Sequence, residues 1–353
     1  MKTNKTKRRI LSFLAFLSIF SNFLCVRAGN TARADTDHSK AECVMEKESR
    51  RILYEFNGET QLPMASTTKI ATAITVLENC NDLKSPFLIP KEAIGIDGSS
   101  IYLKEGDTYS TEELLFGLML RSGNDAATAL AIKTAGSVSE FSKKMNETAE
   151  KAGALHTNFK NPHGLPCSGH YTTSRDLSYI TCYALHNTKF EEIVCTKYYA
   201  ERNWLNKNKM LKLYPFSIGV KTGYTKEAGR CLVSAAKKED MTLVCTVLSS
   251  PDMYNRSIAL LSSCFERYKK TKLLDKSEEF TLESGGNLIT ATAKTDFFYP
   301  LCDGELEHVE IIATAIENQR EKGHSKDKKE EICGKIQIYL LKRLIFSANL
   351  YKL

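Results

Sequence analysis

The chain is 353 residues long and carries 49 lysines and arginines against 42 acidic residues, a formal net charge of +7. Six of the basic residues and none of the acidic ones fall within residues 1–28, so the rest of the chain has a net charge of only +1. A nucleic-acid-binding protein would keep a basic stripe in its folded part. The composition therefore excludes nucleic acid as a partner.

Residues 1–34 are predicted to be a secretory signal peptide. A basic start precedes the apolar run Ile10–Cys25, an order that is typical of export signals, and the run is short for a membrane span. Small residues end the segments Val26–Ala28 and Ala32–Ala34, which predicts cleavage after residue 28 or after residue 34. We expect an exported protein, and a retained membrane anchor is the alternative.

The ten cysteines that follow the signal do not indicate a metal site. Their spacing is irregular, and no Cys-x-x-Cys pair or Cys/His cluster occurs, although zinc sites place their ligands in such pairs. Several lie in apolar runs and are interpreted as small core residues: Cys80, Cys182, Cys245 and Cys264. We predict no metal, no cofactor and no particular disulfide.

The first part of the exported chain is predicted to contain one strand pair and several helices. Two alternating segments, Glu42–Glu48 and Arg51–Phe56, are typical of a hairpin. Short extended pieces are expected at 86–89 and 100–103. Helical patterns extend over five segments, 63–77, 111–120, 125–134, 137–153 and 174–186. In the fourth, Ser137 with Glu140 predicts a capping box.

Strands return in the second part. A strand is predicted at Ile218–Gly223, a hairpin at Cys231–Ala236 and Thr242–Leu248, and a closing helix at Met253–Tyr268. Strands at both ends with helices between them predict an α+β fold, in which helices flank an antiparallel sheet.

Beyond Leu274 the hydrophobic pattern changes. Short strands are expected at 279–282, 288–293 and 335–340, and the charged run Glu317–Glu331 is interpreted as a solvated loop. The sequence therefore predicts a larger domain at 35–272 followed by a small β-rich C-terminal domain at 273–353.

Ser66 and Lys69 are the first candidates for chemistry. Their spacing places both side chains on one face of a helix, about one turn apart. The segment Ile70–Leu77 is apolar almost all round, which predicts a buried helix. A serine hydroxyl needs a neighbouring base to act as a nucleophile at neutral pH, and the lysine is the candidate base.

The Ser-x-x-Lys spacing alone is weak evidence. It recurs at Ser234/Lys237, in a predicted strand where residues three apart face opposite sides, and at Ser325/Lys328 in the charged run. Other clusters are needed to support the first pair.

Two further polar clusters follow in order. Ser122-Gly123-Asn124 lies between two predicted helices, and Lys221-Thr222-Gly223 ends a predicted strand. Together with Ser-x-x-Lys they form the motif set of penicillin-binding proteins and class A β-lactamases. Ser-x-Asn recurs at 347–349, but Lys-Thr-Gly occurs once.

The sequence around these clusters resembles the D-alanyl-D-alanine carboxypeptidase family of low-molecular-mass penicillin-binding proteins. The resemblance rests on five segments and covers about residues 40–270: Leu62–Lys69, Gly117–Ala127, Asn161–Leu165, Gly219–Thr225 and Ala228–Val233. It implies a β-lactamase/transpeptidase-like antiparallel sheet flanked by helices. It also implies a peptidoglycan stem peptide ending in D-Ala-D-Ala as substrate and β-lactam antibiotics as covalent inhibitors. The expected location is the cell wall or the outer face of the cytoplasmic membrane, with peripheral membrane association.

Acyl transfer needs a nucleophile, a base, an oxyanion site and a proton donor for the leaving group. Ser66 is the predicted nucleophile. Lys69 is the predicted base, and burial together with the cation Lys221 would lower its pKa. Ser122 can pass a proton to the departing amine, and Asn124 can hold either the substrate amide or the base.

The remaining predicted site residues bind substrate. Lys221 offers positive charge to a substrate carboxylate, Thr222 offers a hydroxyl, and Gly223 ends the strand. The resemblance implies that the backbone N–H groups of Ser66 and Tyr224 form the oxyanion hole.

Arg256 matches the position at which the family places an arginine near the terminal carboxylate of the substrate. The alternative is a surface arginine of the last predicted helix.

Other functions stay open at this point. A class A β-lactamase would add a glutamate in a Glu-x-x-Leu-Asn setting to activate the deacylating water, and no such stretch lies between Asn124 and Lys221. Glu140, the nearest candidate, has different surroundings. A catalytically silent cell-wall-binding protein would have no reason to keep all three clusters. A cross-linking transpeptidase would use the same acyl-enzyme with an amine in place of water.

Overall fold

The computed structural model describes residues 39–316 and 331–353. The predicted signal peptide and all of the charged run except Glu331 lie outside the described residues, and so do Ser325 and Lys328. Within the described ranges, no helix combines the length and the apolar character that crossing a membrane requires.

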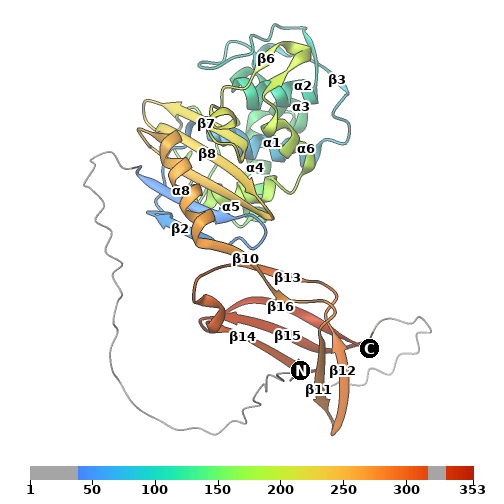
Figure 1. The fold of residues 1–353 in the computed structure, drawn as a ribbon. Helices are drawn as coiled ribbons and strands as arrows, with labels where there is room; N and C mark the ends of the chain where they lie inside the picture. Colours follow the sequence, from blue (N-terminus) through green and yellow to red (C-terminus); the bar gives the residue numbers. More distant parts are fainter. Residues whose placement is uncertain (1–38, 317–330) are drawn as a thin grey trace, which may run out of the picture. The chain divides into compact units, whose positions relative to one another are not determined.

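A five-stranded antiparallel sheet forms the centre of the larger part of the chain (Figure 1). Its strand order is β2-β1-β9-β8-β7, so β7 is an edge strand. The bounds of the strands are β1 Ala41–Glu46, β2 Ile52–Phe56, β7 Ser217–Thr225, β8 Gly229–Lys238 and β9 Met241–Leu248. The predicted hairpins β1–β2 and β8–β9 are confirmed.

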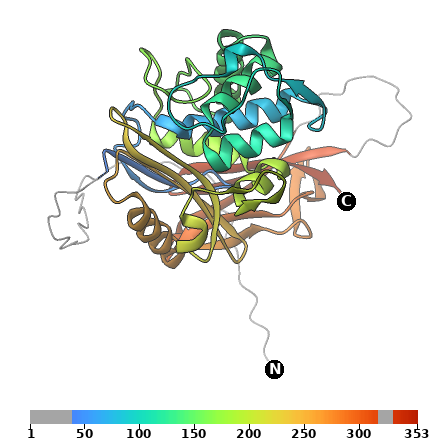
Figure 2. The ribbon, with the colours of Figure 1, turned by 90° about the horizontal axis from the view of Figure 1, so that it is seen from above.

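Helices cover both faces of this sheet (Figure 2). On one face α5 packs on β1 and β9, and α8 packs on β8 and β9 on the other. The bounds of the helices are α1 Lys69–Asn79, α2 Thr111–Phe116, α3 Asn124–Ala135, α4 Val138–Ala152, α5 Ser174–Ala184, α6 Thr188–Cys195, α7 Met210–Leu213 and α8 Met253–Arg267. Two short antiparallel strand pairs lie in the segments that connect the helices. They are β3 Pro86–Leu88 with β4 Thr108–Ser110, and β5 Tyr198–Tyr199 with β6 Trp204–Leu205.

The apolar residues separate into one cluster on each face of the sheet. Successive residues of a strand point to opposite faces, so Val233 joins the cluster around α1 whereas Leu232 joins the cluster under α8. Helix α1 is buried from Lys69 through Val76, as the almost entirely apolar segment Ile70–Leu77 predicts. A lysine and its neighbouring serine are thereby carried into the protein on a rigid, buried element.

Beyond α8 the chain is β-rich, as predicted. A second antiparallel sheet has the order β11-β12-β16-β15-β14, and β10 pairs with β13. Alternate residues of β15 are buried, among them Ile336 and Ile338, in a third apolar cluster. The bounds of the strands are β10 Tyr268–Leu274, β11 Glu279–Ser284, β12 Asn287–Thr292, β13 Phe297–Cys302, β14 Val309–Ala315, β15 Ile332–Leu340 and β16 Arg343–Lys352.

Arg51, in the turn between β1 and β2, contacts the β-rich segment. It donates to the carboxylate of Glu305 and to the carbonyl oxygen of Pro300, and its guanidinium lies 5.2 Å from the ring centres of both Tyr268 and Tyr299. This interaction ties the first hairpin to the strands that follow α8.

The structure contains elements that were not predicted. They are the helices α6 and α7 and the strands β4, β5, β6, β10, β13, β14 and β16. Residues 100–103, predicted to be extended, are irregular, because the carboxylate of Asp125 binds the N–H groups of Ile101 and Leu103 in place of a neighbouring strand. The division into domains at 272/273 stays a prediction.

Candidate active site

Ser66 lies in a 3-10 turn, Ala65–Thr68, that leads directly into α1. Ala65 has a φ of 50°, a strained conformation that persists only where the surrounding packing imposes it. The serine is partly exposed, whereas Thr67 and Thr68 are buried. Because the first N–H groups of a helical segment lack partners within it, this turn can offer donors to a developing oxyanion.

Lys69 is fully buried and forms three hydrogen bonds. Its Nζ lies 3.0 Å from Ser66 Oγ, 2.6 Å from Asn124 Oδ1 and 2.6 Å from the carbonyl oxygen of His163. Carbonyl oxygens only accept hydrogen bonds. In a neutral amine the two hydrogens therefore go to these oxygens, and the lone pair faces the serine hydroxyl. That is the geometry of a general base.

The surroundings of Lys69 favour its neutral form. Burial lowers its pKa well below the usual value, and the cation Lys221 lowers it further; Asp125 acts in the opposite direction and Lys207 adds a smaller lowering effect. None of the three groups that bind Nζ is a carboxylate. The ammonium form is thus disfavoured at the position where a base is needed.

Asn124, the first residue of α3, is oriented by the loop that precedes it in the chain. Its Nδ2 donates to the carbonyl oxygen of Asp97, which leaves Oδ1 directed at Lys69. Its backbone N–H donates to the carbonyl oxygen of Ser99 at 2.7 Å. Of the two predicted roles, the geometry corresponds to holding Lys69, and contact with the substrate amide stays a prediction.

Ser122 follows a π-helical segment, Gly117–Arg121, that separates α2 from α3. Its backbone is left-handed, with φ 64° and ψ 31°, and π-helical segments are frequent at functional sites. The residue is 7% exposed, and its hydroxyl forms no hydrogen bond within residues 39–316 and 331–353. A hydroxyl in this state is available to a substrate.

Lys221 and Thr222 lie on β7, whose contacts include the Ser66 turn. Lys221 is 2% exposed, and its Nζ donates to the carbonyl oxygen of Thr222 at 3.0 Å. Burial, with a smaller effect of Lys207, lowers the pKa of Lys221 to about 7. No described carboxylate forms an ion pair with this lysine, and its contact with a substrate carboxylate stays a prediction.

Gly223 lets β7 approach the nucleophile. A Cβ at this position would lie 3.0 Å from both the Ser66 nitrogen and the Met64 carbonyl oxygen, tighter than ordinary van der Waals contact. Tyr224 follows and is 65% exposed. The two N–H groups predicted to form the oxyanion hole therefore belong to segments that lie side by side, while their joint role stays a prediction.

Gly164 lets the turn Asn161–Pro166 close on the nucleophile from another direction. Its φ is +90°, and a Cβ would overlap the carbonyl oxygen of Ala65. The side chain of Asn161 holds the turn, since its Oδ1 accepts the Gly164 N–H at 2.7 Å. A glycine is required here both by the backbone conformation and by the close approach.

His163 serves the site through its backbone. Its carbonyl oxygen accepts from Lys69, whereas its ring Nδ1 accepts the Leu165 N–H at 3.2 Å. Burial, with smaller effects of Lys69 and His170, lowers the pKa of His163 to about 3. The ring is therefore neutral at physiological pH and acts within the turn.

Sequence reasoning missed Asp97, His163 and Asp125 as supports of the site. The first two act through carbonyl oxygens, which every residue carries, so their identity gives no signal. Asp125 is different, because a carboxylate directly after the Ser-x-Asn cluster could have been noticed. It accepts the N–H groups of Ile101 and Leu103 at 3.1 Å and fixes the loop that orients Asn124.

Arg256 pairs with a buried carboxylate in this structure, and its predicted contact with the substrate stays a prediction. It lies on α8, where its Nε and a terminal nitrogen donate to the carboxylate of Glu42 at 2.8 and 2.6 Å, and the same nitrogen lies 3.1 Å from the Tyr54 hydroxyl. Glu42 is 2% exposed. Because a buried carboxylate without a partner is strongly unfavourable, this ion pair stabilises the packing of α8 on the sheet.

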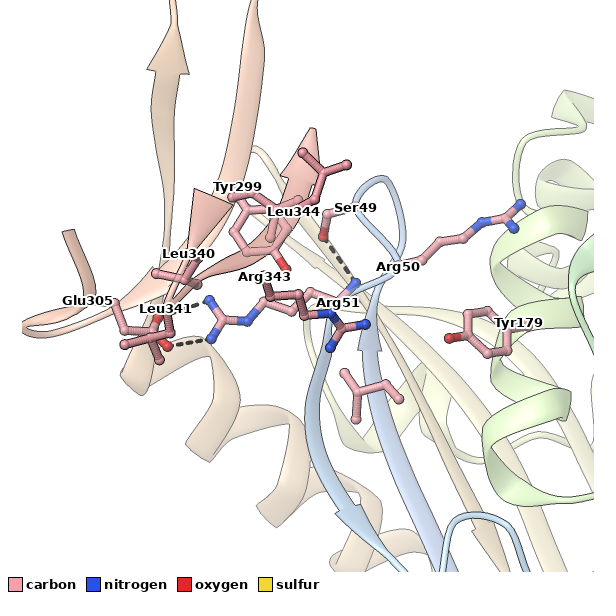
Figure 3. A pocket seen from close by; sticks show the side chains of 12 residues that line it. Ser49, Arg50, Arg51, Tyr179, Tyr299, Glu305, Leu340, Leu341, Arg343 and Leu344 are labelled. Atoms are coloured by element: carbon pink, nitrogen blue, oxygen red, sulfur yellow. Dashed lines mark hydrogen bonds and ion pairs between the residues drawn. The ribbon is translucent and has the colours of Figure 1, made fainter. Parts of the chain in front are cut away.

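A cavity of about 500 Å³ lies elsewhere and contains none of the predicted site residues (Figure 3). It is lined from the β1–β2 turn, α5, β13 and the β15–β16 hairpin. In the close-up, the side chains of Arg343 and Tyr179 point toward each other across it. The site at Ser66 is thus identified by its chemistry and not by the size of a cavity.

The structure also addresses the glutamate that a class A β-lactamase would need. Glu140 lies in the first turn of α4, is exposed and pairs with Lys143 at 2.7 Å. Among the described residues, no carboxylate forms a hydrogen bond with Ser66 or Lys69, and no group of three His, Cys, Asp or Glu side chains is arranged to hold a metal ion.

Comparison with known proteins agrees with this geometry. The family described as D-alanyl-D-alanine carboxypeptidase matches residues 28–252. D-alanyl-D-alanine carboxypeptidase DacF of Bacillus subtilis is 34% identical over 259 residues, which span 68% of this chain and 65% of that protein, just under two thirds of its length. The D-alanyl-D-alanine carboxypeptidase of Streptomyces sp. strain K15 is 37% identical over 221 residues, 56% of this chain and 76% of that protein.

Solved structures extend the similarity to the fold. Penicillin binding protein 5 from Haemophilus influenzae superimposes with a TM-score of 0.75 at 25% identity, over 91% of this chain and 98% of that chain. The Streptomyces K15 DD-transpeptidase superimposes with a TM-score of 0.62 at 33% identity, over 66% of this chain and 98% of that chain. The predicted α+β fold is confirmed. Taken with the three clusters around Ser66, these similarities show that the chain belongs to the D-alanyl-D-alanine carboxypeptidase family of serine peptidases.

Proposed function

We propose that this protein is an exported carboxypeptidase that removes the terminal D-alanine from peptidoglycan stem peptides through an acyl-enzyme at Ser66. The observation that supports this proposal most strongly is the set of hydrogen bonds made by Lys69 Nζ. Two acceptors take the amine hydrogens, and the lone pair is left for the serine proton. A silent wall-binding protein would gain nothing from a buried lysine without a counter-ion, because such a group destabilises the fold.

In the acylation step, Ser66 Oγ attacks the carbonyl carbon of the penultimate D-alanine while Lys69 takes the serine proton. The negative charge that develops on the carbonyl oxygen is bound by the N–H groups of Ser66 and Tyr224. Such donors contribute roughly 3–4 kcal/mol each in serine hydrolases. The C–N bond then breaks, and Ser122 passes a proton to the departing amine.

Lys221 and Thr222 hold the carboxylate of the leaving D-alanine. Lys221 is suited to this role because it is a buried cation that lacks a carboxylate partner among the described residues. The same contact would recruit β-lactam antibiotics, which carry a carboxylate near their reactive carbonyl. They would acylate Ser66 and remain bound.

Water completes the reaction by hydrolysing the ester at Ser66. Among the described residues, no carboxylate bonds to Ser66 or Lys69, so hydrolysis depends on Lys69 again. An amine can attack the same ester, and the Streptomyces K15 protein is described both as a carboxypeptidase and as a DD-transpeptidase. Cross-linking by this chain is therefore the second candidate function.

The expected location follows from the substrate and from the predicted signal peptide. Stem peptides occur outside the cytoplasmic membrane, so we propose that the protein acts in the cell wall or at the outer face of that membrane. Peripheral association with the membrane belongs to this proposal.

The test is intact-mass spectrometry after addition of benzylpenicillin, together with measurement of D-alanine released from Nα,Nε-diacetyl-L-Lys-D-Ala-D-Ala. We expect a long-lived adduct and D-alanine release, both lost in Ser66→Ala. An adduct that vanishes within seconds while the drug is consumed would indicate a β-lactamase. A new peptide product on addition of an amine acceptor would indicate a transpeptidase. If no adduct forms and no D-alanine is released, the proposal that this protein is a serine carboxypeptidase is wrong.

A further inference from the structure

A groove begins at the Ser66 turn and continues past the end of β7. Two adjoining hollows form it: one has a volume of about 430 Å³, and a smaller one reaches Ala65 and Thr225. Both hollows share five lining residues: Pro63, Pro166, Cys167, His170 and Glu227. None of these five takes part in the acyl-transfer steps described above.

The edge strand β7 determines how a bound peptide would run. An edge strand has backbone N–H and C=O groups that can pair with an extended peptide. A substrate with its carboxylate at Lys221 and its reacting carbonyl at Ser66 runs antiparallel to β7. Its residues before the cleaved bond then continue past Tyr224 and Thr225, at about 3.3 Å per residue, and reach the groove.

The groove offers one negative charge. Glu227 is exposed, is the only charged side chain among the residues lining the two hollows, and forms no ion pair with any described residue. Lys226, its neighbour in the chain, is exposed and does not line either hollow. A cationic ligand group would therefore find an uncompensated carboxylate here.

His170 does not add a positive charge to the groove. Burial lowers its pKa to about 4. Both ring nitrogens are occupied, since Nδ1 accepts the Lys160 N–H at 3.0 Å and Nε2 lies 3.0 Å from Thr68 Oγ1. The imidazole ring is therefore neutral at physiological pH and lines both hollows of the groove.

We propose that this groove is a substrate subsite, in which Glu227 binds the free ammonium group of a side chain that precedes the cleaved D-Ala-D-Ala bond. The inference rests on the proposed function, because the acyl-transfer geometry sets the direction of the peptide. A lysine-type side chain fits the chemistry: its aliphatic stem can lie along Pro63 and Pro166 while its ammonium group reaches the carboxylate. Glu227 thus determines specificity without touching the reacting atoms.

The test compares two peptides that differ only in this charge, Nα-acetyl-L-Lys-D-Ala-D-Ala and Nα,Nε-diacetyl-L-Lys-D-Ala-D-Ala. We expect kcat/KM to be about two- to fivefold higher for the peptide with the free amine, the size expected of an exposed ion pair. The preference should shrink as salt is added. Glu227→Gln should remove it by lowering the rate for the free-amine peptide alone.

Glu239→Gln is the matched control. It makes the same change in the turn between β8 and β9, at the opposite end of β8 from the turn that holds Glu227. We expect the preference for the free amine to persist in this variant.

The subsite and the carboxypeptidase can fail separately. D-alanine release from the diacetylated peptide reports the enzyme, and only the ratio between the two peptides reports the subsite. If neither peptide is hydrolysed, the degree to which each slows acylation of Ser66 by benzylpenicillin measures binding directly. Equal rates or equal protection for the two peptides, or a matching loss of both in Glu227→Gln, would overturn the proposal.

Discussion

Positive charge is handled in opposite ways in two regions of this protein. Around Ser66, Lys69 and Lys221 are buried and have no carboxylate bound to their ammonium nitrogens within the described chain. Under α8, Arg256 donates two hydrogen bonds to the buried carboxylate of Glu42. The first region leaves its cations uncompensated, and the second neutralises its cation.

This difference separates a reactive site from a structural one. An uncompensated buried lysine has a lowered pKa, so it can lose its proton near neutral pH and act as a base or receive a carboxylate. A paired arginine keeps its proton and stabilises the packing of a helix on a sheet. Five predictions bear on these regions; four are ordered by their expected effect on the reaction at Ser66, and one concerns stability alone.

Lys69→Met should have the largest effect. Without the amine, no other described group is hydrogen-bonded to Ser66 Oγ to take its proton. We expect acylation by benzylpenicillin to slow about 10³-fold, within the range for loss of a general base. The rate of adduct formation by intact mass measures this. Lys237→Met, in the other described Ser-x-x-Lys pair, should leave the rate unchanged. If the Lys69→Met variant is acylated rapidly, Lys69 is not the base that activates Ser66.

Gly164→Ala should come next. The added Cβ would overlap the Ala65 carbonyl oxygen and displace the nucleophile turn, and displacements near 1 Å can slow a reaction about 10²-fold. Gly136→Ala is the matched control: it shares the left-handed conformation with a φ of +76° but has open space around its Cβ. If both variants slow acylation equally, backbone conformation and not close approach is the cause.

A change of pH should affect kcat/KM less than these two substitutions affect acylation. Lys221 has a lowered pKa of about 7 and binds a carboxylate only when protonated, so kcat/KM should fall about tenfold per pH unit above that value. It should also fall at low pH as Lys69 becomes protonated. A peptide ending in a carboxamide should lack the alkaline fall. The same fall with the carboxamide would show that another group causes it.

Stability should respond to pH in a related way. The lowered pKa of Lys221 means that the unfolded chain binds more protons than the folded protein between about pH 7 and the usual lysine value near 10.4. The free energy of unfolding therefore gains from this group as pH rises through that window.

Arg256→Met should have the smallest effect on acylation, within about twofold, and a clear effect on stability. Removing one partner of a buried ion pair costs about 3–5 kcal/mol. Because the arginine side chain is 37% exposed, we expect a loss of about 2 kcal/mol after allowing for solvent screening. Urea unfolding measures it, and Glu42→Gln with Arg256→Met should recover part of the loss. Slowed acylation in a folded variant would return Arg256 to the active site.

Much of the fold could be predicted because its signals are local. The hairpins at β1–β2 and β8–β9 follow from alternation, and the start of α4 follows from Ser137, whose side chain accepts the Glu140 N–H. Helix α6 was missed because it is only eight residues long. The irregular loop at 100–103 was mistaken for a strand because the partner of its N–H groups, Asp125, lies beyond any local pattern.

The residues of the candidate site also fall into those that local sequence motifs predict and those that only the packed structure reveals. Ser66, Lys69, Ser122, Asn124 and Lys221 could be named because their side chains form motifs. The carbonyl oxygens of Asp97 and His163 could not be named because every residue has one. The pairing of Arg256 with Glu42 could not be predicted because the two lie 214 residues apart, and only the packing of α8 on the sheet brings them together.

The amino-acid sequence specifies which reactive groups are present and how neighbouring ones are spaced, since a separation of three residues puts Ser66 and Lys69 about one helical turn apart. Which cations are compensated depends on how the folded elements pack. A pKa depends on burial and on charges across space, and these arise only when α1, α3 and the edge strand β7 are packed together. The same serine and lysine in an unpacked chain would be an ordinary hydroxyl and an ordinary ammonium group.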